Sequence, residues 1–248
     1  MNNLIQIKNI SKQFRTSEGI VNALSDISIE IPGGQITVIA GENGSGKSVL
    51  MNILASLEDF DSGEIFFDDK PINKAGKPAG LVFQEAETQI LGETPREDIA
   101  FGPKNMGMKK QQVEKAVKDA LEKTGLTKKA DFPARFLSGG EKRRLAVACM
   151  ISMEKPVIIL DEPYANLDFG GVKQVNELLR ELKNQQKTII ITTHEIEKCL
   201  GLAEKLIVLF RGKIVFDGTP EEGIKQNLED WNIKNPLTAY NSVKDLIW

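Results

Sequence analysis

Eight consecutive residues of this 248-residue chain have the composition and spacing of a phosphate-binding loop. They follow the pattern G-x-x-x-x-G-K-S and are Gly41, Glu42, Asn43, Gly44, Ser45, Gly46, Lys47 and Ser48. Glycines allow successive backbone N–H groups to turn toward one anion, and the helix N-terminus adds partial positive charge. We expect Lys47 to reach the β- and γ-phosphates of a nucleotide and the Ser48 hydroxyl to bind Mg²⁺. The alternative is a glycine-rich turn that binds nothing.

The sequence on either side of the loop favours phosphate binding over a plain turn. The apolar run 36–40 predicts a buried strand, and residues 49–54 predict the first turns of a helix. A strand, a glycine-rich loop and a helix in this order are the context that the motif requires.

Two adjacent carboxylates follow a second apolar run more than a hundred residues downstream. Residues 157–160 are Val-Ile-Ile-Leu, and Asp161 and Glu162 come directly after them. A continuous apolar run is typical of a strand buried on both faces, and ligands of open α/β sheets bind at the carboxyl ends of the strands. We therefore expect Asp161 to hold Mg²⁺ and Glu162 to polarise a water for attack on the γ-phosphate. Taken alone, two acids at a strand end also fit a helix cap or a solvated turn.

Residues 137–141, Leu-Ser-Gly-Gly-Glu, precede a predicted helix that extends to about residue 153. This is a second helix N-terminus at which an anion could bind. An ordinary capping box explains Ser138 and Glu141, which stand three residues apart. It does not explain two adjacent glycines, because glycine disfavours helix formation.

Together, these three segments resemble the motifs of ABC-type ATPases, the nucleotide-binding subunits of ABC transporters. The resemblance covers about residues 4–218 and implies roles for further residues. Gln84, after a predicted strand, resembles the glutamine that acts at Mg²⁺ and the attacking water. His194, after the apolar run 188–193, resembles the histidine beside the γ-phosphate. Residues 165–168, which end in Asp168, resemble the D-loop of the family.

The resemblance also implies the position of the nucleotide. Phe14 stands where the family stacks an aromatic ring on adenine, and Val49 follows the phosphate loop. On the residues alone, Phe14 fits the core of a first strand equally well. His194 is the single histidine of the chain, and a lone histidine is more often structural.

The family mechanism uses two chains for each nucleotide. The resemblance implies a head-to-tail dimer with a second ABC ATPase subunit, the same chain or a related one, and with ATP and Mg²⁺ between the two. One subunit supplies the phosphate loop. The other contacts the same ATP in trans through residues that correspond here to Leu137, Ser138, Gly139, Gly140, Glu141 and Asp168.

The segment after Gln84 resembles one subgroup of the family, the energy-coupling-factor transporter ATPases that power uptake of vitamins and of nickel or cobalt ions. The resemblance rests on Phe83, Gln84 and Gln89, on the run Asp-Ile-Ala-Phe-Gly-Pro at 98–103, and on Arg143-Arg144. One departure is the pair Glu85-Ala86, where the subgroup has Asn-Pro. The transported solute is not encoded here, because a membrane partner would select it.

Acidic side chains are frequent in this segment and few cations accompany them in the sequence. One interpretation is a solvated surface. The other is a docking groove for basic cytoplasmic helices of a membrane subunit, formed by Glu85, Glu87, Gln89 and Glu93. The partners implied are a transmembrane energy-coupling subunit and a substrate-binding membrane subunit, at the cytoplasmic face of the cell membrane.

The fold class expected is α/β, a P-loop NTPase of RecA-like type with a mostly parallel sheet. An N-terminal antiparallel β-subdomain and an inserted α-helical subdomain complete it. We expect residues 1–84 and 156–218 to form the nucleotide-binding core, 85–155 the helical insertion, and 219–248 a C-terminal tail. Helices are predicted over about 111–124, 171–186 and 195–203, and a hairpin over 206–216.

Composition separates the rival functions. The formal net charge is −3, which gives no basic footprint for nucleic acid, and no apolar run approaches the length of a membrane span. A soluble ABC ATPase acting on DNA or ribosomes is disfavoured, because no coiled-coil or zinc insertion fits between Ser48 and Asp161. The ATPase of a conventional transporter remains an alternative.

In the tail, four residues have helical spacing: Leu237, Tyr240, Val243 and Ile247. We expect this stripe to pack either on its own domain or on a second ATPase.

Overall fold

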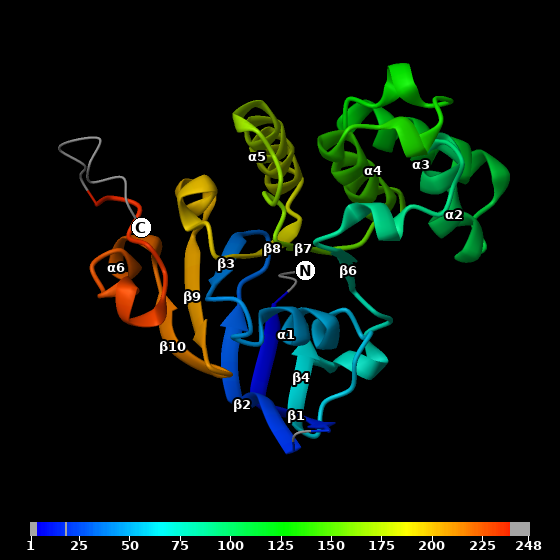
Figure 1. Ribbon diagram of the computed structural model, residues 1–248. Helices are drawn as coiled ribbons and strands as arrows, with labels where there is room; N and C mark the ends of the chain where they lie inside the picture. Colours follow the sequence, from blue (N-terminus) through cyan, green and yellow to red (C-terminus); the bar gives the residue numbers. More distant parts are fainter. Residues whose placement is uncertain (1–3, 18, 239–248) are drawn as a thin grey trace.

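The computed structural model describes residues 4–17 and 19–238. A six-stranded sheet of order β10-β9-β3-β8-β7-β6 forms its centre (Figure 1). All neighbours in this sheet are parallel except β9 and β10. The strands are β3 (Ile36–Ala40), β6 (Ala79–Val82), β7 (Val157–Asp161), β8 (Thr188–Thr193), β9 (Lys205–Phe210) and β10 (Lys213–Gly218).

A second, antiparallel sheet is formed by two strands near the N-terminus and two strands that follow the first helix. Its order is β2-β1-β4-β5. The strands are β1 (Ile5–Thr16), β2 (Gly19–Ile31), β4 (Ser62–Phe67) and β5 (Lys70–Pro71). The mostly parallel sheet with an N-terminal antiparallel sheet confirms the predicted fold class.

Alternation along each central strand divides the hydrophobic core into two layers. In β7, Val157 and Ile159 face the antiparallel sheet and helix α1 (Lys47–Leu54), whereas Ile158 and Leu160 face the opposite helical layer. Because successive side chains of a strand point to opposite faces, a strand covered on both faces must be apolar throughout.

The helical layer contains α5 (Phe169–Asn184) and three helices inserted between β6 and β7. These are α2 (Pro95–Asn105), α3 (Lys110–Lys123) and α4 (Gly139–Ser152), which gather to one side of the sheet in Figure 1. Helix α3 buries Val113, Val117, Ala120 and Leu121, the face that the apolar spacing predicts. The division of the chain into core, insertion and tail remains our prediction.

The hairpin of β9 and β10 is as predicted. Arg211 and Gly212 join the strands and both have positive φ, 49° and 73°. Two central residues with positive φ define the turn that suits the twist of a two-residue hairpin. A helix over 195–203 is wrong: the chain forms two short 3₁₀ turns, Ile196–Lys198 and Leu200–Leu202. Cys199 between them has φ −141°, outside the helical region, and Gly201 further disfavours a continuous helix.

The end of the described chain packs back onto the core. After α6 (Pro220–Gly223), Leu228 and Ile233 are buried in the helical layer and Trp231 packs against it. Leu237, the first residue of the predicted stripe, is exposed. Tyr240, Val243 and Ile247 lie outside the described residues. Across residues 4–17 and 19–238, no helix is long and apolar enough to cross a membrane.

Candidate nucleotide site

The sheet order places the predicted site residues on adjacent loops. Strands β3, β8, β7 and β6 are parallel neighbours, so their carboxyl ends lie along one edge. The phosphate loop follows β3, His194 follows β8, Asp161 ends β7, and Gln84 follows β6. Residues as far apart as 41 and 194 in sequence are thereby brought together, in agreement with the rule for ligand sites in such sheets.

The phosphate loop is shaped by close approach of the backbone to two other segments. A Cβ at Gly41 would lie 2.3 Å from the carbonyl oxygen of Leu209, and one at Gly46 would lie 2.5 Å from that of Ala23. Gly46 also has φ 105°, a conformation that L side chains rarely adopt. The buried Oγ of Ser45 has no hydrogen-bond partner in the described chain. A hydroxyl without a partner in an anion-binding loop fits a phosphate oxygen as its missing acceptor.

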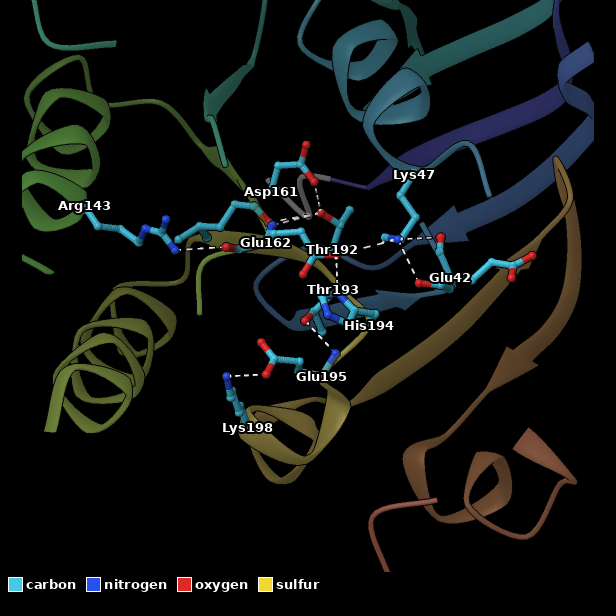
Figure 2. A network of polar contacts seen from close by, with 12 residues as sticks. Glu42, Lys47, Arg143, Asp161, Glu162, Thr192, Thr193, His194, Glu195 and Lys198 are labelled. Carbon is cyan, nitrogen blue, oxygen red and sulfur yellow. Dashed lines mark hydrogen bonds and ion pairs between the residues drawn. The ribbon is translucent and has the colours of Figure 1, made fainter. Parts of the chain in front are cut away.

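Lys47 is buried and folds back onto its own loop. Its Nζ donates to the carbonyl oxygens of Gly41 at 2.8 Å and Glu42 at 3.0 Å, and lies 3.6 Å from Glu162 Oε1 (Figure 2). Burial lowers the pKa of this ammonium, against the opposing effect of the nearby Glu162 and Asp161 carboxylates. Burial removes water from this ammonium. A bound phosphate would give it new charge-assisted hydrogen bonds and so stabilise its protonated form.

Asp161 and Glu162 leave the end of β7 in different directions. The Asp161 carboxylate accepts a hydrogen bond from the Thr192 hydroxyl on the neighbouring strand. The backbone N–H of Glu162 donates to the carbonyl oxygen of Thr192 at 3.0 Å, and Glu162 takes a φ of 46°. A non-glycine residue in this region is held there by its surroundings.

The Glu162 carboxylate is buried between two nitrogen groups. His194 Nδ1 lies 3.1 Å from Glu162 Oε1, the same oxygen that lies 3.6 Å from Lys47 Nζ. The imidazole is part-exposed, whereas the Glu162 side chain is 7% exposed. A carboxylate that is buried, and oriented by neighbours, suits a general base at a strand end.

Gln84 contacts the rest of the site through its backbone carbonyl. Its carbonyl oxygen accepts from Arg143 Nη2 at 2.8 Å, and its side chain is exposed. Phe14 is half-buried on β1, with the ammonium of Lys12 5.0 Å from its ring centroid. A ring with a cation over one face can still offer the other face to a base.

The residues predicted to act in trans stand at two helix N-termini. Ser138 caps α4: its Oγ accepts from the N–H of Glu141, whose carboxylate accepts from the N–H of Ser138. Asp168 caps α5 by accepting from the N–H of Gly171 at 2.7 Å. A Cβ at Gly140 would lie 3.8 Å from Leu167 Cδ2, so the two N-termini are adjacent. The capping box is therefore present, and Ser138 and Gly139 are also exposed.

The segment after Gln84 forms part of a pocket of about 570 Å³ on the helical insertion. Its lining includes Glu87, Glu93, Arg135 and Lys142. Lys142 forms an ion pair with Glu87, so the segment is less acidic in space than in sequence. The carboxamide of Gln89 bonds to the backbone of Leu81 and Phe83, and Glu85 is exposed.

Two residues that contact the predicted catalytic residues were not identified from sequence as part of the site. Thr192 orients Asp161 and Glu162, but a threonine inside an apolar strand gives no signal of its own. Arg143 is named only as a subgroup feature, although its guanidinium also donates to the carbonyl oxygen of Glu162 at 2.9 Å. The two acceptors stand 59 and 19 residues away in the chain, and only the fold brings them to one side chain.

Comparison with known proteins agrees with this geometry. A family model described as ABC transporter matches residues 24–165, more than half of the chain. The energy-coupling factor transporter ATP-binding protein EcfA of Methanocaldococcus jannaschii is 36% identical over 92% of this chain and 84% of its own length. A putative ABC transporter ATP-binding protein of Methanosarcina mazei is 38% identical, and the chain spans 50% of its length.

Solved structures show the same relationship. The structure of cbiO1 from Clostridium perfringens, described as part of the ABC transporter complex cbiONQ, has a TM-score of 0.81 and 32% identity, covering 95% of this chain and 97% of that one. A dimeric ATP-binding cassette, MJ0796, bound to ADP and Pi in a post-hydrolysis state, has a TM-score of 0.78 and 26% identity, covering 87% and 98%. With the phosphate loop and the strand-end carboxylates in place, the chain belongs to the ABC transporter family, as an ATP-binding and ATP-hydrolysing protein of the energy-coupling-factor group.

Proposed function

We propose that this ATPase powers an energy-coupling-factor importer for vitamins or transition-metal ions. It works at the cytoplasmic face of the cell membrane, with a second ATPase subunit, a transmembrane energy-coupling subunit and a substrate-binding membrane subunit. No nucleic acid takes part. The relatives named as energy-coupling factor proteins support this subgroup. The observation that favours a docked partner is the pocket on the helical insertion that Glu87 and Glu93 line.

The phosphates of ATP bind to the loop 41–48, where Lys47 exchanges its bonds to the Gly41 and Glu42 carbonyls for phosphate oxygens. The orphan Oγ of Ser45 supports this placement. Adenine stacks on Phe14, whose ring is half-buried. Val49 and Asn43 complete the cradle around the phosphates.

Mg²⁺ fits the oxygen donors at the strand ends. The Asp161 carboxylate, the Ser48 hydroxyl and the Gln84 amide oxygen would hold it, and these are the ligand types that Mg²⁺ prefers. When bound, the ion neutralises charge that develops on the β- and γ-phosphate oxygens.

Water activation belongs to Glu162. Its carboxylate accepts the proton of the attacking water, and Lys47 and His194, which both contact Oε1, fix its direction. His194 then donates to the γ-phosphate, where negative charge develops. The second subunit completes the site with Leu137, Ser138, Gly139, Gly140, Glu141 and Asp168.

The docking surface is the pocket lined by Glu87, Glu93, Arg135 and Lys142, to which we add the exposed Glu85. Gln89 shapes this surface from within, because its carboxamide is bonded to the backbone of β6 and the residue after it. A basic cytoplasmic helix of a membrane subunit would pair with the acids, and Glu87 would exchange Lys142 for an arginine of that helix.

Charge reversal at the pocket tests the proposal. Glu87→Lys together with Glu93→Lys should leave the basal ATPase of the isolated subunit within about threefold, under ~1 kcal/mol in barrier. The same double variant should fail to co-purify with membrane components and should abolish uptake in cells. Glu114→Lys, on the exposed face of α3, is the matched control and should retain both. Persistent uptake in the double variant would contradict the docking surface.

A further inference from the structure

Arg143 is a cation removed almost completely from water, with 6% of its surface exposed. Nη1 donates to the carbonyl oxygen of Glu162 at 2.9 Å, and Nη2 donates to that of Gln84 at 2.8 Å. Its Nε has no hydrogen-bond partner among the described residues. Burial lowers the pKa of the guanidinium, and the charge of Glu162 opposes that effect. A buried cation without a full set of partners is costly, so its contacts need an explanation beyond packing.

Both carbonyl acceptors lie at the carboxyl edge of the central sheet, where Glu162 follows β7 and Gln84 follows β6. Glu162 stands in the left-handed region, where its backbone must be held by its neighbours. Its N–H is fixed by Thr192, and its carbonyl oxygen accepts from the N–H of Ala165 at 3.2 Å as well as from Arg143. The bond from Arg143 to the Glu162 carbonyl is drawn in Figure 2. The second arm of the guanidinium joins this carbonyl to the segment after β6 at Gln84.

Arg143 connects Glu162 to the helix that carries Ser138. It lies on α4, four residues after Gly139, in the helix whose N-cap is Ser138. Helix α4 therefore presents exposed Ser138 and Gly139 at its end and reaches its own subunit's Glu162 from its side. Any change in the position of α4 relative to the sheet would therefore act on the Glu162 carbonyl through this hydrogen bond.

We propose that Arg143 is a positioning residue that fixes the Glu162 backbone to α4 and so sets the direction of the Glu162 carboxylate. The inference rests on the proposed role of Glu162 as the base that activates water. The hydrogen bonds of Arg143 are to two backbone carbonyls, so it acts through Glu162. Its planar fork reaches two carbonyls at once, which an ammonium cannot do with the same geometry.

The experiment compares steady-state ATP hydrolysis of Arg143→Met, Arg143→Lys and the wild-type protein. We expect kcat to fall at least about tenfold in Arg143→Met and less in Arg143→Lys, with KM for ATP within about twofold in both. Lys187→Met is the matched control. Lys187 is a half-buried cation that, like Arg143, donates to two backbone carbonyls, those of Glu154 and Lys155, but it lies directly before β8, at the end opposite His194. Its loss should lower the thermal midpoint and leave kcat unchanged.

A second measurement separates positioning from general damage. In a Glu162→Gln background, adding Arg143→Met should not change the amount of ATP-dependent dimer seen by size-exclusion chromatography, because the carboxylate that Arg143 directs is already absent. Loss of that dimer would overturn the inference, and so would wild-type kcat in Arg143→Met. If Arg143→Met does not fold, wild-type kcat in folded Arg143→Lys overturns it.

Glu162→Gln alone distinguishes the two possible failures. Normal hydrolysis in that variant would overturn the role of Glu162 as the base. Stalled hydrolysis there, together with wild-type kcat in the Arg143 variants, would overturn the positioning role alone.

Discussion

Lys47 shows how a single side chain links burial to ligand binding. Its ammonium loses hydration in the loop and is compensated by two carbonyl oxygens and a carboxylate at 3.6 Å. Desolvation, the largest influence, lowers its pKa from 10.5, while the charges of Glu162 and Asp161 act in the other direction. A bound triphosphate adds negative charge and raises that pKa again.

The affinity for ATP should therefore depend on pH in a defined direction. The protonated lysine binds phosphate, so the affinity is complete below the lowered pKa of the free protein and falls as the pH rises through it, in a window that lies below 10.5. Titration calorimetry with a non-hydrolysable ATP analogue from about pH 8 upward measures the change, at up to about tenfold per pH unit. Lys47→Arg, which stays charged, should bind without this dependence. A dissociation constant that stays the same up to pH 10.5 would contradict a buried ammonium with a lowered pKa.

Asp98 is a buried carboxylate that joins three segments of the helical insertion. It lies in the first turn of α2 with 5% of its surface exposed. Oδ1 accepts from the N–H groups of Leu91 at 2.7 Å and Gly92 at 2.8 Å, and Oδ2 accepts from Cys149 Sγ on α4 at 3.3 Å. One carboxylate thus fixes the loop that enters the helical insertion against two of its helices.

Removing that carboxylate should cost stability more than nucleotide binding. Asp98→Ala leaves two backbone N–H groups without their acceptor, and we expect the free energy of unfolding to fall by about 2–4 kcal/mol. Urea denaturation measures the loss, and Asp98→Asn, which keeps an acceptor oxygen, should lose less. An exposed substitution on α3, Glu114→Ala, should leave the midpoint nearly unchanged. A full loss of ATP affinity in folded Asp98→Ala would place this residue in the site and not in the scaffold.

The elements that could be predicted from sequence are those whose signal is local. The strands at 36–40 and 188–193 have the predicted bounds, because both are short runs rich in isoleucine and other β-branched residues and every residue in them is buried. The turn at Arg211-Gly212 follows from its residue types. The segment 195–203 could not be predicted, because its apolar spacing suits a helix while Cys199 leaves the helical region. The forked contact of Arg143 depends on the strand order, which no local pattern encodes.

At the scale of the whole molecule, the position of Ser138 is the main argument for a dimer. Ser138 and Gly139 are exposed at the N-terminus of α4, next to the loop that ends in Asp168. The phosphate loop stands at the carboxyl edge of β3, in another part of the chain. The neighbour at 26% identity is a dimeric cassette. A head-to-tail pair would bring the Ser138 of one subunit to the phosphate loop of the other.

Mixing two inactive variants tests this arrangement. Lys47→Ala removes the phosphate-binding ammonium, and Ser138→Arg blocks the N-terminus of α4 at a cost of about 1 kcal/mol for the lost cap. In a mixed dimer of the head-to-tail type, both lesions fall on one composite site and the other site is intact. Random pairing of equal amounts should restore up to about a quarter of wild-type hydrolysis, since half of the dimers are mixed and each has one of two sites. If single sites do not turn over, ATP trapped by the mixture, and by neither variant alone, gives the same answer. Normal hydrolysis by Ser138→Arg on its own would exclude a contact of this helix with the neighbour's nucleotide.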